Sequence, residues 1–368
     1  MCRNKYRILF ERIVLLVILI VGFSACTTGN PGQPETAIPP STATGTQSPT
    51  FTPTETPVPS ATSTVTPIPQ VSLAAVGDLM LARTIGERVQ AEGPQVIFAG
   101  VQPIFDMADI LVGNLECAIT ERGQPQPKGY TFRAPLDAVH SLQLAGFDLL
   151  TLANNHAMDY GAEGLQDTQA LLAQAGMAYT GTGSNEAEAR APVILVKNGL
   201  RMAFLGYVDV PVEVRGFDTR AWIATPSEPG VAWADPGNIA TDVAAAKLQS
   251  DVVIVMLHSG YEGVVEPNTI QRQAARAAID AGATLVIGAH PHVLQPVEWY
   301  NGGLIAYSLG NFVFDDFGLE LNRTAILFVT LGKDGIQDYN WIPVIIDNGL
   351  PRLASGEDAR IILEMVSP

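Results

Sequence analysis

The sequence predicts an α/β protein whose one folded domain contains a mixed sheet, or two sheets packed face to face, between helices. From residue 71 onward, short β-rich runs alternate with Ala-rich stretches, which is the pattern of an α/β domain. Most of the β-rich runs are continuously apolar, as in strands that are covered on both faces. No linker-like break divides the segment, so we expect a single domain over residues 71–368.

The first 25 residues have the features of an export signal. Four basic residues lie within the first 12 positions, and an apolar run follows at residues 13–23. This run is short for a membrane-spanning helix but suits a signal-peptide core. It leads into Cys26 in a pattern that resembles a bacterial lipoprotein signal, although Phe23 stands where Leu is usual. The resemblance implies lipidation of Cys26 and an extracytoplasmic lipoprotein anchored to the cell membrane; the alternative is an uncleaved N-terminal anchor.

Residues 26–70 form a predicted tether. From residue 31 to residue 70 the chain consists almost entirely of Pro, Thr, Ser and small residues, and only Glu35 and Glu55 are charged. The segment has no apolar periodicity, so burial cannot offset the entropy of ordering its backbone. We expect an extended, disordered spacer that holds the domain away from the membrane.

The folded domain is strongly acidic. The chain has a formal net charge of −16, and without the four basic and three acidic residues of the first 70 positions the remainder has a net charge of −17. Such a surface repels phosphate backbones, so we expect no nucleic-acid partner. Cys117 is the one Cys beyond the tether, which excludes a disulfide within the domain, so packing of the core must supply its stability.

The predicted elements follow one another in a regular order. Strands are predicted at residues 71–76, 110–113, 149–152, 202–207, 252–257, 285–287 and 304–307, and helices at residues 136–145, 164–175, 236–248 and 269–281. Two of these helices end before Gly146 and Gly282, because Gly just past the last turn is a stop signal. Further on, residues 325–331 and 339–346, joined by a turn at 332–335, predict an antiparallel hairpin.

Polar side chains follow the ends of six apolar runs. They are Asp78; Asn114 and Glu116; Asn154, Asn155 and His156; His258 and Glu262; His290 and His292; and Asn311. Ligands of open α/β sheets bind beyond the carboxyl ends of the strands, so we expect these residues to converge. Four of the five His lie in these turns, and His140 lies within a predicted helix. Imidazole, carboxylate and amide groups together suit Mn, Fe or Zn, which predicts a metal site.

The ordered motifs also carry a family resemblance. They are Gly77-Asp78, Gly113-Asn114-Leu115-Glu116, Asn154-Asn155-His156-x-x-Asp159-x-Gly161, His258-x-Gly260-x-Glu262, Gly288-x-His290-Pro291-His292 and Ser308-Leu309-Gly310-Asn311-Phe312. This series, spread over residues 71–315, resembles the CapA family of bacterial poly-γ-glutamate capsule synthesis proteins. That family is similar to the calcineurin-like metallophosphoesterases. The resemblance implies a four-layer sandwich of two mixed sheets flanked by helices, with a metal-dependent hydrolase site.

The resemblance also implies roles for individual residues. The metal ligands would be Asp78, Glu116, Asn155, His258, His290 and His292, and they would hold one or two divalent transition metals. His156 would be the catalytic general acid, and Asn114 a further contact. Independently of the resemblance, guanidinium groups suit phosphate and carboxylate, so Arg83 and Arg133 are candidates to bind an anionic substrate, with surface ion pairing as the alternative.

One position departs from the phosphoesterase pattern. Those enzymes begin with Asp-x-His, whereas this chain has Asp78-Leu79-Met80, so one metal would lack a donor. Glu262 or Asp159 would be substitutes, Glu262 being a candidate substrate contact as well.

Two functions therefore stay open. One is a surface-tethered hydrolase that acts on a phosphoester or on an anionic extracellular polymer. The other is a non-catalytic component of capsule assembly or export, which works with membrane proteins of capsule synthesis and binds polymer in a degraded metal cleft.

Overall fold

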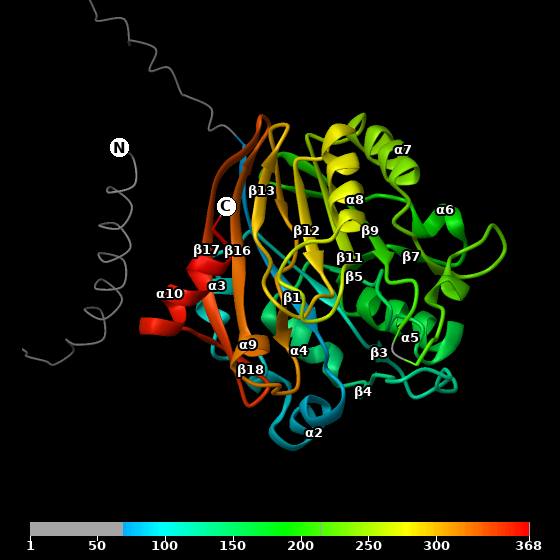
Figure 1. The fold of residues 1–368 in the computed structure, drawn as a ribbon. Helices are drawn as coiled ribbons and strands as arrows, with labels where there is room; N and C mark the ends of the chain where they lie inside the picture. The colour runs from blue at the N-terminus through cyan, green and yellow to red at the C-terminus, as the bar shows by residue number, and fades with distance from the viewer. Residues whose placement is uncertain (1–68, 214, 368) are drawn as a thin grey trace, which may run out of the picture. The chain divides into compact units, whose positions relative to one another are not determined.

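The fold is built on two mixed sheets (Figure 1). The computed structural model describes residues 69–213 and 215–367, so the predicted signal, Cys26 and nearly all of the tether lie outside the described residues. The first sheet has the order β18-β17-β16-β1-β2-β5-β6, with β15 paired to β1 as well. Its strands are β1 (Gln70–Leu79), β2 (Ile110–Leu115), β5 (Leu149–Thr151), β6 (Ala178–Thr180), β15 (Asn311–Val313), β16 (Arg323–Gly332), β17 (Gly335–Asp347) and β18 (Leu350–Leu353). Strands β1, β2, β5 and β6 are parallel, whereas β16, β17 and β18 are antiparallel.

The second sheet has the order β13-β14-β12-β11-β9-β8. Its strands are β8 (Val193–Lys197), β9 (Leu200–Asp209), β11 (Val252–Ser259), β12 (Leu285–Ala289), β13 (Val297–Tyr300) and β14 (Gly303–Ala306). The four central strands are parallel and the two edge strands are antiparallel. Parallel central strands place their carboxyl ends at one edge of the sheet, where β11 and β12 deliver His258 and His290.

Helices cover the outer faces of both sheets. The helices are α2 (Arg83–Glu92), α3 (Gln102–Phe105), α4 (Ala138–Ala145), α5 (Gly161–Gln174), α6 (Glu186–Ala189), α7 (Pro236–Lys247), α8 (Thr269–Asp280), α9 (Leu319–Asn322) and α10 (Gly356–Met365). Figure 1 shows α7 and α8 on one side of the domain and α10 on the other, beside β16 and β17. None of the described helices is long and apolar enough to cross a membrane. Short strands β3 (Ala118–Ile119), β4 (Arg133–Ala134), β7 (Thr182–Gly183) and β10 (Gly230–Val231), with two short 3-10 helices at Pro94–Val96 and Thr219–Trp222, complete the described elements.

Three apolar layers hold the sandwich together. Between the sheets, side chains such as Leu73 and Val112 of the first pack with Phe204 and Ile254 of the second. Outside the first sheet, side chains of α2, α4 and α5 pack in another cluster, and outside the second sheet α7 and α8 do the same. Both faces of the central strands are therefore buried, which explains why those strands are continuously apolar in sequence.

The structure confirms the predicted fold class and resolves it as two sheets. All seven predicted strands and all four predicted helices form, with ends shifted by a few residues, and the antiparallel hairpin is β16 with β17. Gly146 ends α4 with a positive φ of 87°, as its position predicts. The elements missing from the prediction are mostly short or lie at edges, as β6, β8 and β13 do, and α2 is missing because most of its residues are polar.

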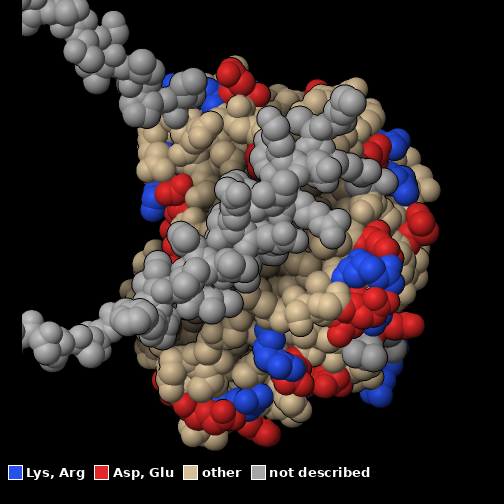
Figure 2. Space-filling view, turned by 90° about the vertical axis from the view of Figure 1, so that its left-hand side faces the viewer, with Lys and Arg blue, Asp and Glu red and all other residues tan. Residues whose placement is uncertain are grey.

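Charges on the surface are intermixed. Figure 2 shows acidic and basic side chains lying beside one another around the edge of one face of the molecule. Exposed ion pairs such as Arg88 with Glu92 and Arg352 with Asp347 agree with that picture. Exposed pairs of this kind contribute little to stability, so we assign the stability of the domain to the apolar layers.

Candidate metal centre

The carboxyl ends of strands from both sheets meet at one buried cluster of polar side chains. Asp78, the next-to-last residue of β1, pairs in register with Asn114 of β2 and with Asn311 of β15. From the second sheet, His258 lies near the end of β11, and the turn after β12 contributes His290 and His292. The predicted convergence of polar strand ends is therefore present in the structure.

Close approach of the backbones at this edge requires glycine. A Cβ atom at Gly77 would lie 1.9 Å from the carbonyl oxygen of Gly310, and one at Gly288 would lie 1.9 Å from that of Tyr307. No side chain fits at such distances. The Gly before Asp78 and the Gly two residues before His290 thus allow the neighbouring segments to come together.

The turn that contains His290 and His292 has an unusual backbone. Both residues have positive φ angles, 94° for His290 and 58° for His292, in a region that non-glycine residues rarely adopt. The His290 N–H donates to Asp78 Oδ2 at 3.2 Å, and His292 Nδ1 lies 3.1 Å from the same oxygen. Strained backbone of this kind clusters at functional sites, and here it brings one backbone N–H and one imidazole to the same carboxylate oxygen.

Two groups of side chains have the spacing of metal ligands. In one group Asp78, Glu116 and His258 offer ligand atoms within 4.8 Å of one another, and in the other Glu116, His290 and His292 do so. The groups share Glu116: its Oε1 lies 3.6 Å from His258 Nε2 and 4.0 Å from His292 Nε2. A shared carboxylate between two sets of donors is the arrangement needed to bridge two cations.

Several buried atoms of the cluster have no hydrogen-bond partner among the described residues. They are both carboxylate oxygens of Glu116, Nδ1 of His290 and Oδ1 of Asn311. A buried polar atom without a partner is costly, and a buried carboxylate especially so. Burial, with the charge of Asp78 nearby, raises the pKa of Glu116 well above its usual range. A bound cation would satisfy these atoms, so the residues present fit a divalent metal.

The imidazoles are prepared for ligation. Burial lowers the pKa of His258 and of His290 well below the usual range, which keeps both rings neutral and able to ligate a metal. His292 differs: burial also lowers its pKa, but its hydrogen bond to Asp78 and the charge of that carboxylate raise the pKa overall. Neutral imidazole with carboxylate and amide oxygen is a donor set for Mn, Fe or Zn.

Asn155 completes the ligand side of the cluster. Its Oδ1 lies 2.7 Å from His258 Nε2, and its Nδ2 donates to Glu213 Oε1 at 2.8 Å. Asn114 has a supporting place: its Nδ2 donates to Asp78 Oδ1 at 2.8 Å and lies 3.1 Å from His258 Nδ1. Asn114 therefore orients two predicted ligands from within the protein.

His156 lies beside the cluster in a fixed orientation. Its ring stacks on Phe132 with the centroids 4.0 Å apart, and its Nδ1 lies 2.7 Å from Asp159 Oδ2. Burial, with the charge of Lys128, lowers the pKa of His156 well below its usual range. Burial raises the pKa of Asp159 to about 7, against the opposing charge of Lys128. Asp159 thus engages one nitrogen of the ring, and no hydrogen bond from the described residues engages the other.

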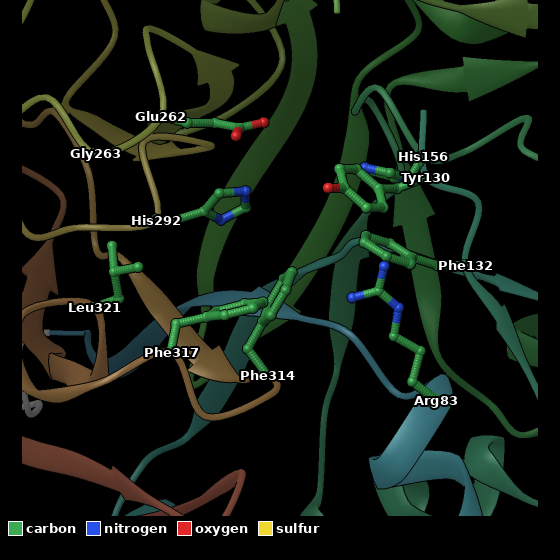
Figure 3. Close-up of a pocket in the computed structure, with 10 residues that line it drawn as sticks. All are labelled: Arg83, Tyr130, Phe132, His156, Glu262, Gly263, His292, Phe314, Phe317 and Leu321. Carbon is green, nitrogen blue, oxygen red and sulfur yellow. The ribbon is translucent and has the colours of Figure 1, made fainter. Parts of the chain in front are cut away.

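A cavity of about 420 Å³ opens next to these residues (Figure 3). Its lining residues are Arg83, Tyr130, Phe132, His156, Glu262, Gly263, His292, Phe314, Phe317 and Leu321. In Figure 3, Glu262 and His292 lie across the cavity from His156 and Arg83. The Arg83 guanidinium lies over the Phe132 ring, 4.6 Å from its centroid, and also pairs with Asp315 at 3.0 Å. The Arg83 guanidinium and the Glu262 carboxylate thus lie on opposite walls of a cavity that is lined largely by aromatic side chains.

Not every predicted residue reaches the site. Arg133 is not among the residues that line the cavity: its guanidinium lies 3.7 Å from the centroid of the Tyr160 ring and donates to the carbonyl oxygens of Arg122 and Gly123. Arg133 therefore lies outside this cavity, although it lines a second pocket with Arg83, and a substrate contact of Arg133 stays a prediction. Asp159 does not supply the donor that is missing at Met80, because its carboxylate is bonded to Lys128, His156 and the Phe132 N–H.

Met80 and Cys117 are structural. Met80 is fully buried in the apolar cluster outside the first sheet, and its Sδ accepts from the Ala82 N–H at 3.2 Å. Its thioether therefore does not replace the expected His. Cys117 is a buried free thiol whose pKa burial raises to about 12, so it is not a nucleophile.

The structure adds two residues to the site, Lys128 and Glu213, and it brings Asn311 there as its place at the end of an apolar run predicts. Asn311 was detectable, because it ends an apolar run as Asp78 does, but no role follows from that pattern alone. Lys128 and Glu213 lie in loops without a motif, and only the three-dimensional arrangement brings them beside Asn155 and His156.

Comparison with known proteins gives a consistent result. Residues 72–316 match the family model described as bacterial capsule synthesis protein PGA_cap. The chain is 36% identical over 284 residues to the PGA biosynthesis protein CapA of Bacillus subtilis (strain 168), covering 76% of this chain and 73% of that one. It is 33% identical to the capsule biosynthesis protein CapA of Bacillus anthracis, covering 77% and 69%. Among solved structures, a phosphatase from Mycoplasma pneumoniae superposes with a TM-score of 0.50 at 12% identity, over 76% of this chain and 94% of that one, which is a likeness of fold alone.

Proposed function

The chain belongs to the bacterial capsule synthesis protein family PGA_cap, and from this premise we propose that it is a CapA-type protein of poly-γ-glutamate capsule biosynthesis with a metal-dependent hydrolase site. The observation that carries the hydrolase proposal is Glu116. A fully buried carboxylate with two unpartnered oxygens, shared by two groups of imidazole and carboxylate donors, supports cation binding far better than it supports stability.

The proposed ligands are those of the cluster. Asp78, Glu116 and His258 would hold one cation, and Glu116, His290 and His292 a second, with Asn155 Oδ1 at the edge of the first group. Such cations supply Lewis-acid chemistry, in which they polarise a substrate oxygen and make a water a better nucleophile. The remaining chemistry belongs to the protein's own side chains.

His156 would move the proton of the reaction. Because Nδ1 is engaged by Asp159, Nε2 is the nitrogen left for the substrate. Burial and the charge of Lys128 keep the ring neutral, so Nε2 can take a proton from the attacking water while Asp159 faces Nδ1, and the ring can then give this proton to the departing oxygen. Arg83, with one guanidinium nitrogen on Asp315, has further N–H groups for an anionic part of the substrate.

We propose that this site lies outside the cytoplasm. The lipoprotein-like signal and the Pro- and Thr-rich tether support a domain anchored to the membrane through Cys26. Its substrate would be a phosphoester or a bond of an anionic extracellular polymer, and its partners would include membrane proteins of capsule synthesis. A non-catalytic role in polymer assembly is the second candidate, because Met80 leaves one phosphoesterase ligand without a counterpart.

The test combines metal analysis with activity. Protein stripped with a chelator and reloaded with Mn²⁺ is analysed by elemental mass spectrometry and assayed on p-nitrophenyl phosphate, bis-p-nitrophenyl phosphate and γ-glutamyl-p-nitroanilide. We expect His290→Ala/His292→Ala to lose metal and activity. His140→Ala, which changes an exposed residue on α4, is the matched control and should keep both. Wild-type protein that binds Mn²⁺ but hydrolyses none of these compounds would favour the assembly role.

A further inference from the structure

We infer that Lys128 and Glu213 are positioning residues, which together hold the predicted ligand Asn155 and the predicted proton donor His156 in their working orientations. The inference rests on the proposed function, since it concerns how that site is held in place. Lys128 lies in the segment between β3 and β4, and Glu213 lies in the segment between β9 and the short helix Thr219–Trp222. Neither segment contributes a predicted ligand.

Lys128 is the centre of the arrangement. Its side chain is fully buried, and its Nζ lies 2.8 Å from Asp159 Oδ1 and 2.7 Å from Glu213 Oε1. The same nitrogen also donates to the carbonyl oxygen of Asn155 and lies 3.4 Å from His156 Nδ1. One ammonium group therefore contacts four residues of the site, with its three donors directed at carboxylate and carbonyl oxygens.

The buried ammonium orients His156 through Asp159. Asp159 Oδ1 accepts from Lys128, and Asp159 Oδ2 faces His156 Nδ1 and accepts from the Phe132 N–H. The carboxylate is thus held at both oxygens, and the plane of the imidazole is set by this contact and by the stack on Phe132. Without Lys128, the carboxylate would be held at Oδ2 alone, by the Phe132 N–H, and its Oδ1 would have lost its partner.

Glu213 orients the amide of Asn155. An ionised carboxylate only accepts, so the Asn155 group that faces Glu213 Oε1 must be the amide nitrogen. The amide oxygen must then point to the opposite side, where it lies 2.7 Å from His258 Nε2 at the cluster. Lys128 holds Glu213 in this position through the same Oε1 atom.

A purely structural role of Lys128 and Glu213 would affect stability but not metal affinity or activity. Buried charges of opposite sign often exist only to neutralise one another. Here, however, each carboxylate paired with Lys128 uses a further contact to fix a polar side chain at the cluster or cavity. Outer partners of this kind typically change metal affinity or activity by about 10–100-fold when they are removed.

The experiment uses matched variants of the full-length protein to separate the effect of Glu213 on Asn155 from the effect of Lys128 on His156. Glu213→Leu removes the acceptor for Asn155, whereas Glu213→Gln retains Oε1. Lys128→Met/Glu213→Gln keeps the net charge of the buried group and the acceptor for Asn155, but loses the contact with Asp159. Lys333→Met, in the turn between β16 and β17, is the surface control. Calorimetry measures the Mn²⁺ affinity of each variant. The kcat and KM of each variant are measured on the phosphoester that the wild type turns over, and its melting temperature is measured without metal.

We expect Glu213→Leu to weaken Mn²⁺ binding by about 10–100-fold and Glu213→Gln by less than about threefold. The double variant should bind Mn²⁺ as Glu213→Gln does, while its kcat falls about 10-fold or more at an unchanged KM. Lower melting temperatures with unchanged Mn²⁺ affinity and unchanged kcat in all variants would overturn the inference and leave the proposed function standing. Absence of Mn²⁺ binding by the wild type would overturn both.

Discussion

Glu116→Gln should separate the effect of the buried carboxylate on metal-free stability from its effect on metal affinity. Both Glu116 oxygens are buried without a partner, and the residue belongs to both ligand groups. The substitution keeps the shape of the side chain but removes its charge and one of its two acceptor oxygens. We therefore expect a metal-free variant at least as stable as the wild type, together with a large loss of metal affinity.

The magnitude follows from linkage. A cation present at 100 times its dissociation constant stabilises the folded state by about 2.7 kcal/mol. For a domain of about 300 residues, with an unfolding entropy of about 2.1 cal/mol/K per residue, this corresponds to a rise of about 4 °C in Tm. If the variant binds the cation 100-fold more weakly, the same concentration stabilises it by only about 0.4 kcal/mol, or less than about 1 °C.

Differential scanning fluorimetry of chelator-stripped protein, with and without Mn²⁺, measures both quantities. Because burial raises the pKa of Glu116, the folded wild type without metal holds that proton more tightly than the unfolded chain does. Its metal-free stability should therefore fall as the pH rises above the ordinary Glu pKa, and that of Glu116→Gln should fall less. Mn²⁺ competes with the same proton, so affinity should rise with pH. Equal Mn²⁺-induced shifts in the two proteins would refute the assignment of Glu116 as a shared ligand.

Three further predictions concern other parts of the site. His156→Ala should lower kcat by about 10²–10⁴-fold while calorimetry shows unchanged Mn²⁺ affinity; loss of metal would instead make His156 a ligand. Asn311→Leu should weaken Mn²⁺ binding, because Asn311 pairs in register with Asp78 and its buried Oδ1 has no partner among the described residues; wild-type affinity in calorimetry would exclude this role. Gly288→Ala should lower stability by about 1–3 kcal/mol in denaturant titrations, since its Cβ would lie 1.9 Å from a carbonyl oxygen, and an unchanged midpoint would contradict that packing.

The fold could be predicted largely from the sequence because its strands are buried on both faces. Continuous apolar runs such as that of β11 and helix stop signals such as Gly146 are local properties, and they were sufficient for the central elements. The cluster could be predicted because parallel strands end at one edge. The contacts of Lys128 and those of Arg133 could not be predicted, because both depend on which loops pack side by side after folding.

Edge strands and short helices show the limits of local pattern. Strand β6 has three residues, and β13 is bordered by polar positions, so neither has a periodicity that distinguishes it from a loop. These strands form because an existing sheet offers hydrogen-bonding groups at its edge. Their formation depends on tertiary structure, as the orientation of Lys128 does.

Ligand donors from both sheets have a mechanical consequence. Asp78 and His292 meet across 214 positions of the chain, one from each half of the sandwich. A cation held by Asp78, Glu116 and His258, or by Glu116, His290 and His292, would act as a reversible cross-link between the two halves, in a domain whose described residues contain one buried thiol and no disulfide. Closing so long a loop lowers the entropy of the unfolded chain, as a disulfide does in many exported proteins. Chelation would remove this cross-link and leave the apolar layer between the sheets in place.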